Sequence, residues 1–537
     1  MMKKFRYSIE TTFKKLGSRH FNVIGPLVIN PKSVKLMTIR QDIQEYSLFI
    51  DGKLTPADKG SLFDSFNPST GKVFARVAKA QAGDLDLAVK AARKAFDQGP
   101  WPRMSLVERG IYLKRLAGLI RKEAKELALL ECLDTGKTIK QTTFIDINTC
   151  AETFEYFSNV TTALDVKEVN IDAPVHCQVS REPYGVVGCI IPWNYPLIMT
   201  AWKMAPALMA GNTVVFKPSP LASVSVARLG EILARVGFPD GAVNVVTSDQ
   251  IDVAKRLVEH EDVDLISFTG GTETGLEVVK SSAKHRVKKT ILELGGKSPN
   301  IVFADCDLEA AVGGTLSAIF MNQGAMCTAG SRLFIEESIY DEFLKRLVER
   351  TKKLKVGPAD QHTTDIGPLI SHGHLEKTLA FVERAKGQGA KVDCGGEAVN
   401  VAGAPEGFYF APTILGDIDH SSEAAQSEIF SPLLYRRAFQ GEEEVVALAN
   451  ATKFGLAASI WTKDLEKANR VTRQLKCGTV WINTYGGFYN EAPYGGFKQS
   501  GVGRELGEEG LNEFTQTKNV ITDQTPGGKP LVTAWFG

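Results

Sequence analysis

An alternation of short β-rich runs with longer helical patterns through the middle of the chain most constrains the fold. The β-rich runs predict strands at residues 186–191, 213–216, 242–246, 265–268 and 290–293. Helical apolar spacing predicts helices between them at residues 198–209, 223–236, 252–260 and 273–282. Strands separated by helices imply βαβ units on a parallel sheet, which binds ligands at the carboxyl ends of its strands. The pattern therefore predicts an α/β fold with a Rossmann-like sheet.

A second alternating block follows the first. It contains predicted strands and helices at residues 300–303, 308–321, 339–354 and 478–483. Before the first block, apolar spacing predicts helices at residues 84–98, 105–133 and 150–160. Two further pieces, residues 177–183 and 518–523, predict a small β-arm. We expect two α/β domains with the arm as a separate small unit.

The composition argues against several classes of protein. The formal net charge is +1, so no basic excess is present to attract nucleic acid. The most apolar stretch, residues 185–211, is interrupted by Asn194 and Lys203 and does not predict a membrane span. The 8 cysteines form no CxxC pair, which favours a reducing compartment and leaves room for one catalytic thiol. Only His372 and His374 lie close together, so we expect no metal site.

The first residues differ from the rest of the chain. Residues 1–36 contain many Lys and Arg side chains but a single acid, Glu10. We expect residues 1–37 to be a basic, unstructured extension and the protein to be cytoplasmic. A basic, acid-poor composition is also typical of a transit peptide, so a mitochondrial location is the alternative.

Three motifs in the chain carry chemistry. Cys327 lies in Met-Asn-Gln-Gly-Ala-Met-Cys-Thr-Ala-Gly-Ser-Arg, residues 321–332. Glu293 ends an apolar run just before Leu-Gly-Gly-Lys-Ser-Pro, and Asn194 lies in Pro-Trp-Asn-Tyr-Pro. A thiol, a carboxylate and an amide are the groups needed to form a thioester and to hydrolyse it.

Together these motifs resemble the signature set of the NAD(P)-dependent aldehyde dehydrogenase superfamily, with most likeness to betaine-aldehyde and aminoaldehyde dehydrogenases. The resemblance covers about residues 46–522. It implies an NAD-binding domain at 38–164 and 184–295, a catalytic domain at 296–500, and an oligomerisation arm with a C-terminal tail at 165–183 and 501–537. It also implies a homodimer or homotetramer that acts on a small-molecule aldehyde.

The resemblance assigns a role to each of the three residues. Cys327 attacks the aldehyde to form a thiohemiacetal, which loses hydride to the nicotinamide and becomes a thioester. The Asn194 amide and the backbone N–H of Cys327 stabilise the oxyanion. Glu293 activates the water that hydrolyses the thioester, and burial should raise its pKa. From the residues alone, Asn194 could equally be the polar residue of a turn before Pro196.

Lys203 and Glu505 resemble a pair that relays the proton of this water to solvent. A surface salt bridge is the alternative interpretation of the same two residues. Glu293 also separates two reactions, because relatives that pass the acyl group to coenzyme A typically lack this carboxylate.

The cofactor site is predicted from several short motifs. Residues 268–275, rich in glycine, follow a strand and open a helix, which suits a pyrophosphate. With the resemblance, the predicted cofactor residues are Ile191, Pro192, Trp193, Lys217, Ser219, Gly270, Gly271, Leu294, Gly295, Glu428 and Phe430. Pro220 stands where many NAD-selective relatives have a glutamate. We therefore expect NAD as the preferred cofactor and leave NADP open.

Aromatic residues dominate the predicted substrate pocket. Its expected members are Tyr195, Trp202, Met321, Phe488 and Tyr494. Several rings together could hold a cationic amine through cation–π attraction, as for betaine aldehyde or an aminoaldehyde. Met321 leaves this cage incomplete, because plant betaine-aldehyde enzymes often have an aromatic residue there. A broad-specificity or aromatic aldehyde dehydrogenase remains the alternative.

Three competing functions are weaker. A coenzyme A-acylating dehydrogenase conflicts with the presence of Glu293. A catalytically silent structural relative conflicts with the intact Cys327, Glu293 and Asn194. A metal-dependent hydrolase conflicts with the scattered histidines.

Overall fold

The computed structural model describes residues 43–160 and 164–527. The predicted basic extension at 1–37 and the tail residues 528–537 lie outside the described ranges. Within these ranges, the two large sheets belong to one unit of the chain that begins at Ile43. None of the helices described is both long enough and apolar enough to cross a membrane.

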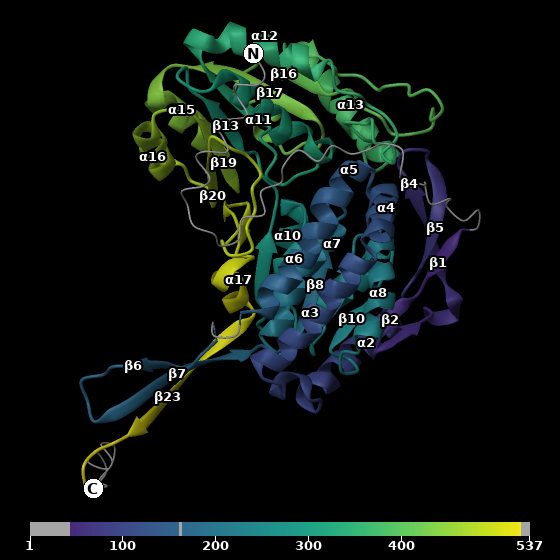
Figure 1. Ribbon diagram of the computed structural model, residues 1–537, viewed down its shortest axis with the longest axis vertical. Helices are drawn as coiled ribbons and strands as arrows, with labels where there is room; N and C mark the ends of the chain where they lie inside the picture. The colour runs from purple at the N-terminus through teal and green to yellow at the C-terminus, as the bar shows by residue number, and fades with distance from the viewer. Residues whose placement is uncertain (1–42, 161–163, 528–537) are drawn as a thin grey trace, which may run out of the picture. The chain divides into compact units, whose positions relative to one another are not determined.

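The first predicted block forms the parallel centre of an eight-stranded sheet (Figure 1). Its parallel strands are β8 (Val186–Ile191), β9 (Thr213–Pro218), β10 (Val243–Val245), β11 (Leu265–Thr269) and β12 (Lys289–Glu293). Short antiparallel strands extend it at the edges, namely β2 (Leu48–Ile50), β3 (Lys53–Thr55) and β22 (Gly501–Val502). The order is β22-β12-β11-β8-β9-β10-β2-β3. The Rossmann-like prediction is confirmed.

Helices cover both faces of this sheet, so its strands are buried on both sides. Val187 and Cys189 of β8 belong to one core, whereas Val186 belongs to the other. This alternation follows from the two-residue period of a strand. The covering helices are α2 (Ala82–Asp97), α3 (Leu106–Lys122), α6 (Ile147–Ser158), α7 (Pro196–Met209), α8 (Val224–Val236), α9 (Ile251–Glu259) and α10 (Thr272–Ser282).

The single helix predicted at residues 105–133 is wrong, because the structure has two helices there. Helix α3 ends at Lys122 and α4 (Ala124–Thr135) begins after Glu123, whose φ of −105° leaves the helical region. Both halves pack on α8, but α3 packs mainly on α6, whereas α4 also contacts a π-helical turn at Thr142–Asp146. The apolar spacing continues through the break, so periodicity alone could not locate it.

The second block forms a seven-stranded sheet in the order β15-β16-β17-β14-β13-β19-β20. Its strands are β13 (Pro299–Val302), β14 (Arg332–Glu336), β15 (Lys391–Cys394), β16 (Thr413–Gly416), β17 (Leu433–Phe439), β19 (Ala457–Trp461) and β20 (Thr479–Ile482). Its helices include α11 (Leu308–Phe320), α12 (Tyr340–Thr351), α13 (His372–Gly387), α15 (Gly441–Asn450) and α16 (Leu465–Gln474). All its strands are parallel except β15, which confirms the second α/β unit.

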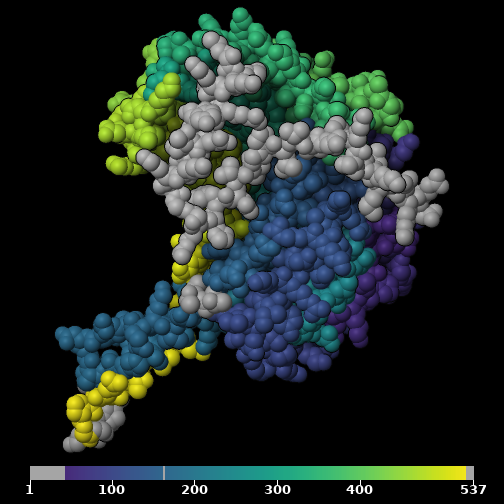
Figure 2. Space-filling model, in the orientation of Figure 1, coloured from purple at the N-terminus to yellow at the C-terminus, as the bar shows by residue number. Residues whose placement is uncertain are grey.

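Three antiparallel strands form the predicted arm. They are β6 (Lys167–Val169), β7 (Val175–Pro183) and β23 (Thr515–Asp523), with β7 in the centre. Figures 1 and 2 show the arm extending away from helix α17 (Gly507–Glu513) and the first sheet. Gly501 and Val502, which fall in the range expected for the arm and C-terminal tail, pair with β12 of the first sheet, and the arm strand β23 begins at Thr515.

Candidate active site

A cavity of about 620 Å³ opens at the carboxyl ends of β8, β9, β11 and β12. Its wall includes every residue predicted to hold the cofactor: Ile191, Pro192, Trp193, Lys217, Ser219, Gly270, Gly271, Leu294, Gly295, Glu428 and Phe430. Cys327, Glu293 and Asn194 line the same cavity. The structure thus brings the three chemical motifs and the cofactor motifs together at the sheet edge where parallel sheets bind ligands.

An unusual turn presents Cys327 to this cavity. After α11, Asn322, Gln323 and Gly324 have φ values of 49°, 52° and 73°, so three successive residues are left-handed. Such a conformation is unfavourable for residues other than glycine and persists only where the surroundings hold it. The Asn322 side chain supplies part of this support, because its Nδ2 donates to the carbonyls of Ala325 (3.0 Å) and Asn194 (3.1 Å).

The buried Asn194 side chain is tied to the loop that carries Cys327. Its Nδ2 donates to the carbonyl of Ala325 at 2.9 Å. The amide therefore bonds to a distant loop rather than to its own turn. A side-chain amide has two N–H groups, so one remains to meet an oxygen beside Cys327.

Glu293 ends β12 and is buried, with 4% of its surface exposed. Neither carboxylate oxygen has a hydrogen-bond partner among the described residues. Burial raises the pKa of Glu293 well above its ordinary value, and the nearby charge of Glu505 raises it further. Lys203 and Arg504 oppose this rise in pKa. The geometry leaves both oxygens available to accept a proton.

Lys203 and Glu505 form a buried ion pair, so the alternative of a surface salt bridge is wrong. Lys203 lies in α7 and is 0% exposed; Glu505 is 2% exposed. The Lys203 ammonium also donates to Ser267 Oγ at 3.1 Å. Because Glu505 influences the pKa of Glu293, the pair lies within electrostatic reach of that carboxylate.

The cofactor side of the cavity combines a helix N-terminus with two charged side chains. Gly271 caps the N-terminus of α10. A Cβ placed on Gly271 would meet nothing within 4 Å, so there is open space beside the first backbone N–H groups of this helix. Lys217 Nζ donates to the carbonyls of Pro218 and Ser248, each at 3.1 Å. Burial lowers the pKa of Lys217 to about 8.

Glu428 reaches the cavity from the second α/β unit. Its carboxylate accepts a hydrogen bond from the backbone N–H of Gly296 at 2.9 Å. A Cβ at Gly295 would lie 2.1 Å from Glu428 Oε2, so this approach requires glycine. Burial raises the pKa of Glu428 to about 7.

His374 supports the aromatic end of the cofactor wall, a contact that the sequence did not reveal. The Phe430 ring meets Trp193 edge-on at 5.3 Å between centroids, and His374 meets Trp193 at 5.7 Å. The Ser431 Oγ atom lies 3.0 Å from His374 Nε2. Burial lowers the pKa of His374 to about 4, so this imidazole is neutral at pH 7.

Three predicted pocket residues form an aromatic cluster beside the thiol. Trp202, Phe488 and Tyr494 contact one another with ring centroids 5.2 to 5.8 Å apart. Trp481, which the sequence analysis missed, extends the cluster by meeting Phe488 at 5.6 Å. The Tyr494 hydroxyl lies 3.1 Å from Cys327 Sγ, so the cluster touches the nucleophile itself.

The other two predicted pocket residues are Tyr195, which packs against the same core as Trp202 and Tyr494, and Met321. Tyr195 lines the main cavity, and its ring lies 4.3 Å from Lys137 Nζ. Met321 starts the turn before Cys327 and packs with Tyr195 against the core of the second unit.

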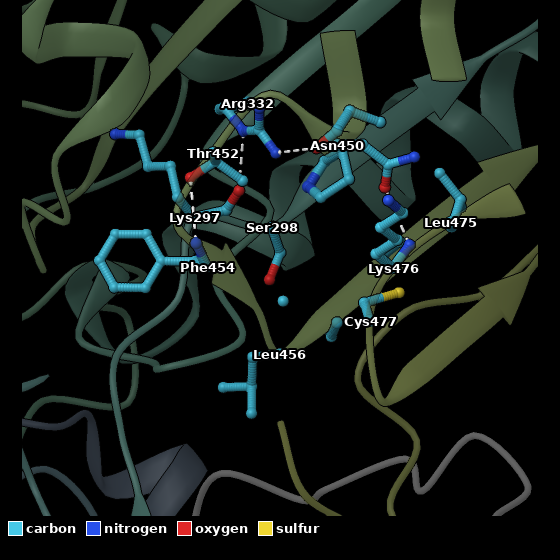
Figure 3. Close-up of a pocket in the computed structure, with 15 residues that line it drawn as sticks. Lys297, Ser298, Arg332, Asn450, Thr452, Phe454, Leu456, Leu475, Lys476 and Cys477 are labelled. Atoms are coloured by element: carbon cyan, nitrogen blue, oxygen red, sulfur yellow. Dashed lines mark hydrogen bonds between the residues drawn. The ribbon is translucent and has the colours of Figure 1, made fainter. Parts of the chain in front are cut away.

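Two further hollows differ in size and chemistry. One of about 470 Å³ is lined by residues that include Glu152, Glu155, Tyr156, Phe488 and Glu491. Phe488 therefore joins this acidic hollow to the aromatic cluster. Figure 3 shows the other, where Arg332 donates to the carbonyl of Lys297. With about 10 Å³ it has room for roughly one water molecule and not for an aldehyde.

Comparison with known proteins agrees with this geometry. The sequence model of the "Aldehyde dehydrogenase family" matches residues 54–520. A betaine aldehyde dehydrogenase of Bacillus subtilis (strain 168) is 43% identical over 493 residues, covering 91% of this chain and 99% of the relative. Retinaldehyde dehydrogenase 3 of Mus musculus is 41% identical over 480 residues, covering 89% and 93%. A solved betaine aldehyde dehydrogenase from Staphylococcus aureus in complex with NAD+ has a TM-score of 0.88 at 37% identity, covering 92% and 97%. The chain belongs to the aldehyde dehydrogenase family, as its motifs predicted.

Proposed function

We propose that the protein oxidises an aldehyde to the carboxylic acid with NAD, through a thioester on Cys327. The observation that carries this proposal is the convergence of Cys327, Asn194 and Glu293 on the cavity whose wall holds the predicted dinucleotide residues. The cavity suits a dinucleotide because a helix N-terminus opens into it and glycine leaves room for Glu428.

In the first half of the reaction, the Cys327 thiolate forms a bond to the aldehyde carbon and the carbonyl electron pair moves to oxygen. The remaining Asn194 N–H and the backbone N–H of Cys327 stabilise this oxyanion. One preorganised donor of this kind contributes about 3–4 kcal/mol in a transition state. When bound, the nicotinamide accepts the hydride that leaves the tetrahedral carbon.

In the second half, water attacks the thioester carbon while Glu293 takes its proton, and the C–S bond breaks to release the carboxylic acid and restore the Cys327 thiolate. The raised pKa of Glu293 and its unpartnered oxygens suit a base that works near neutral pH. The buried Lys203–Glu505 pair is the proposed route by which this proton leaves, as the resemblance to the family implies. Hydrolysis rather than transfer to coenzyme A follows from the presence of this carboxylate.

NAD is the proposed cofactor, with NADP left open. Relatives of this chain have been solved with NAD+. Pro220 lines the cavity near Lys217 and Ser219. A proline can neither bond to ribose hydroxyls nor repel a 2′-phosphate, so it supplies no selectivity of its own.

A cationic aldehyde is the proposed substrate class. The aromatic cluster is the proposed binding site for the ammonium group, because its rings lie beside Cys327 and aromatic rings attract cations. The acidic hollow beside Phe488 adds negative charge, because Glu152 and Glu491 line it. The charge of the third glutamate there, Glu155, is paired with Arg121. The similarity to a betaine aldehyde dehydrogenase supports this choice. The similarity to a retinaldehyde dehydrogenase favours a neutral aldehyde as the second candidate.

A homo-oligomer in a reducing compartment, such as the cytoplasm, completes the proposal. The arm exposes Val169, Ile171, Val520 and Ile521, which a partner chain would cover. All 8 cysteines are unpaired in the described residues, which suits a reducing environment.

Steady-state kinetics with NAD and NADP tests these proposals on betaine aldehyde, 4-aminobutyraldehyde, benzaldehyde and hexanal. Cys327→Ser is expected to abolish oxidation of all four, whereas Cys306→Ser, at a residue that does not line the cavity, retains it. Glu491→Gln should raise KM for the two amines by about 5-fold without changing KM for hexanal, consistent with a charge contact of about 1 kcal/mol. Equal kcat/KM for hexanal and betaine aldehyde would overturn the cationic substrate, and a strong preference for NADP would overturn the cofactor.

A further inference from the structure

Tyr494 has a contact that a wall residue of the substrate pocket does not need. Its hydroxyl oxygen lies 3.1 Å from the sulfur of Cys327, and the residue is 5% exposed. Within the described part of the chain, this oxygen has no other hydrogen-bonding partner. We propose that Tyr494 is a further catalytic residue, whose hydroxyl donates a hydrogen bond to the Cys327 sulfur and stabilises its thiolate form. The inference rests on the proposed role of Cys327 as nucleophile.

The Tyr494 hydroxyl is held firmly in place. The backbone N–H groups and carbonyls of Tyr494 and Glu505 pair reciprocally, with both N–O distances 2.7 Å. The ring is packed edge-on between Trp202 and Phe488. A donor fixed by backbone and ring loses little freedom when it bonds to the sulfur, so its hydrogen bond is effective.

The direction of the hydrogen bond follows from the protonation states. A neutral thiol and a phenol can each donate, but once sulfur loses its proton only the phenol can. Burial raises the pKa of Tyr494 well above its ordinary value, so its hydroxyl remains protonated across the working range. The tyrosine is therefore always able to donate to a thiolate.

The thiolate needs such a donor because its surroundings oppose negative charge. The pKa of Cys327 is raised to about 12, mainly by burial and to a smaller extent by the carboxylates of Glu428 and Glu293. The hydrogen bond from Tyr494 is the largest opposing influence, followed by a backbone hydrogen bond at Thr328. Hydrogen bonds to a charged group are stronger than those between neutral groups.

Two other tyrosines near Cys327, Tyr485 and Tyr195, have different partners in the described part of the chain. Tyr485 donates its hydroxyl to the carbonyl of Thr328. The Tyr195 ring lies against the ammonium group of Lys137, with 4.3 Å between Lys137 Nζ and the ring centroid. Tyr494 is thus the tyrosine whose hydroxyl is directed at sulfur.

Alkylation of the free enzyme by iodoacetamide tests the proposal, because this reagent reacts with thiolate and needs neither aldehyde nor cofactor. Tyr494→Phe keeps the ring and removes one oxygen. We expect the apparent pKa of Cys327 to rise by about one unit and alkylation below that pKa to slow about 10-fold, as for loss of a hydrogen bond to a charged group. Mass spectrometry identifies Cys327 as the alkylated residue. Tyr112→Phe, which removes a hydroxyl from a distant ring stack, should leave the profile unchanged.

If the rate of Cys327 alkylation depends on pH in the same way in the unmodified protein and in Tyr494→Phe, the proposal is overturned. If this variant folds poorly, fluorotyrosine at position 494 provides the second test, because it retains the ring and hydroxyl and is a stronger donor. In this variant the pKa of the Cys327 thiol should fall, and a rise or no change in that pKa would also overturn the proposal. Failure of Cys327 as nucleophile is distinguishable, because aldehyde oxidation would then survive in Cys327→Ser whatever the alkylation profile.

Discussion

At the scale of single residues, Glu293 combines the burial and the free oxygens that a base for thioester hydrolysis requires. Glu293→Gln keeps the shape and removes the base. We expect one rapid turnover that forms NADH and the thioester, then turnover slowed about 10²–10⁴-fold, as for loss of a general base. Stopped-flow fluorescence of NADH measures the burst. Glu349→Gln on the exposed face of α12 is the control and should turn over normally.

The same residue predicts a pH dependence with a definite sign. Because burial raises the pKa of Glu293, the carboxylate form is lost as pH falls through that raised pKa. The rate of thioester hydrolysis should therefore fall on the acid side, and Glu293→Gln should lose this limb. Unchanged steady-state turnover in the variant would contradict the hydrolytic role.

Residues inside local motifs were predictable from sequence, whereas contacts between motifs were not. Cys327, Glu293 and the cofactor residues stand in recognisable strings, and all of them line one cavity. The contact of Tyr494 with Cys327 and that of His374 with Trp193 join segments far apart in the chain. No spacing rule shows which way such side chains face, so these contacts required the structure.

At the scale of elements, a buried charge cluster links α4 to the π-helical turn. Lys137 Nζ donates to Glu131 at 3.0 Å and to Asp146, and all three side chains are 0% exposed. Lys137→Met leaves two buried carboxyl groups without their cation. We expect a loss of about 3–5 kcal/mol in the free energy of unfolding, which thermal and urea unfolding measure. Lys280→Met breaks an exposed pair and should cost less than about 1 kcal/mol.

The loss in Lys137→Met should also depend on pH. Burial raises the pKa of Asp146, and removal of the ammonium raises it further. The folded variant then binds protons that the unfolded chain releases above about pH 4, so its stability rises as pH falls. The deficit should be smaller at pH 5 than at pH 8, and an equal deficit at both would contradict this account.

Elements with strong local signals were predicted well, and those defined by tertiary contacts were not. Strands such as β8 and β9 are continuous apolar runs because both faces are buried. The edge strand β22 has only two residues and was missed. The π-helical turn before α6 was also missed, because its shape is tied to the charge cluster rather than to a residue pattern.

At the scale of the whole molecule, the proposed chemistry depends on side chains from both large sheets. Glu293 ends strand β12 of the first sheet. Cys327 lies in the loop that leads into strand β14 of the second sheet. The sequence predicted both sheets but not how their ends meet. That arrangement brings Asn194 to the loop of Cys327, since its amide bonds to Ala325 across the junction.

The arm yields a prediction about assembly. Val520 and Ile521 are 45% and 57% exposed on β23, and successive strand residues point to opposite faces. Both faces of the arm therefore carry apolar surface that a partner chain can bury. Ile521→Lys should shift the protein to a smaller species in sedimentation equilibrium, because a charge cannot be buried there without a partner. Val287→Lys, at a side chain 94% exposed outside the arm, should leave the assembly unchanged. An unaltered mass for Ile521→Lys would show that the arm does not hold the oligomer together through this face.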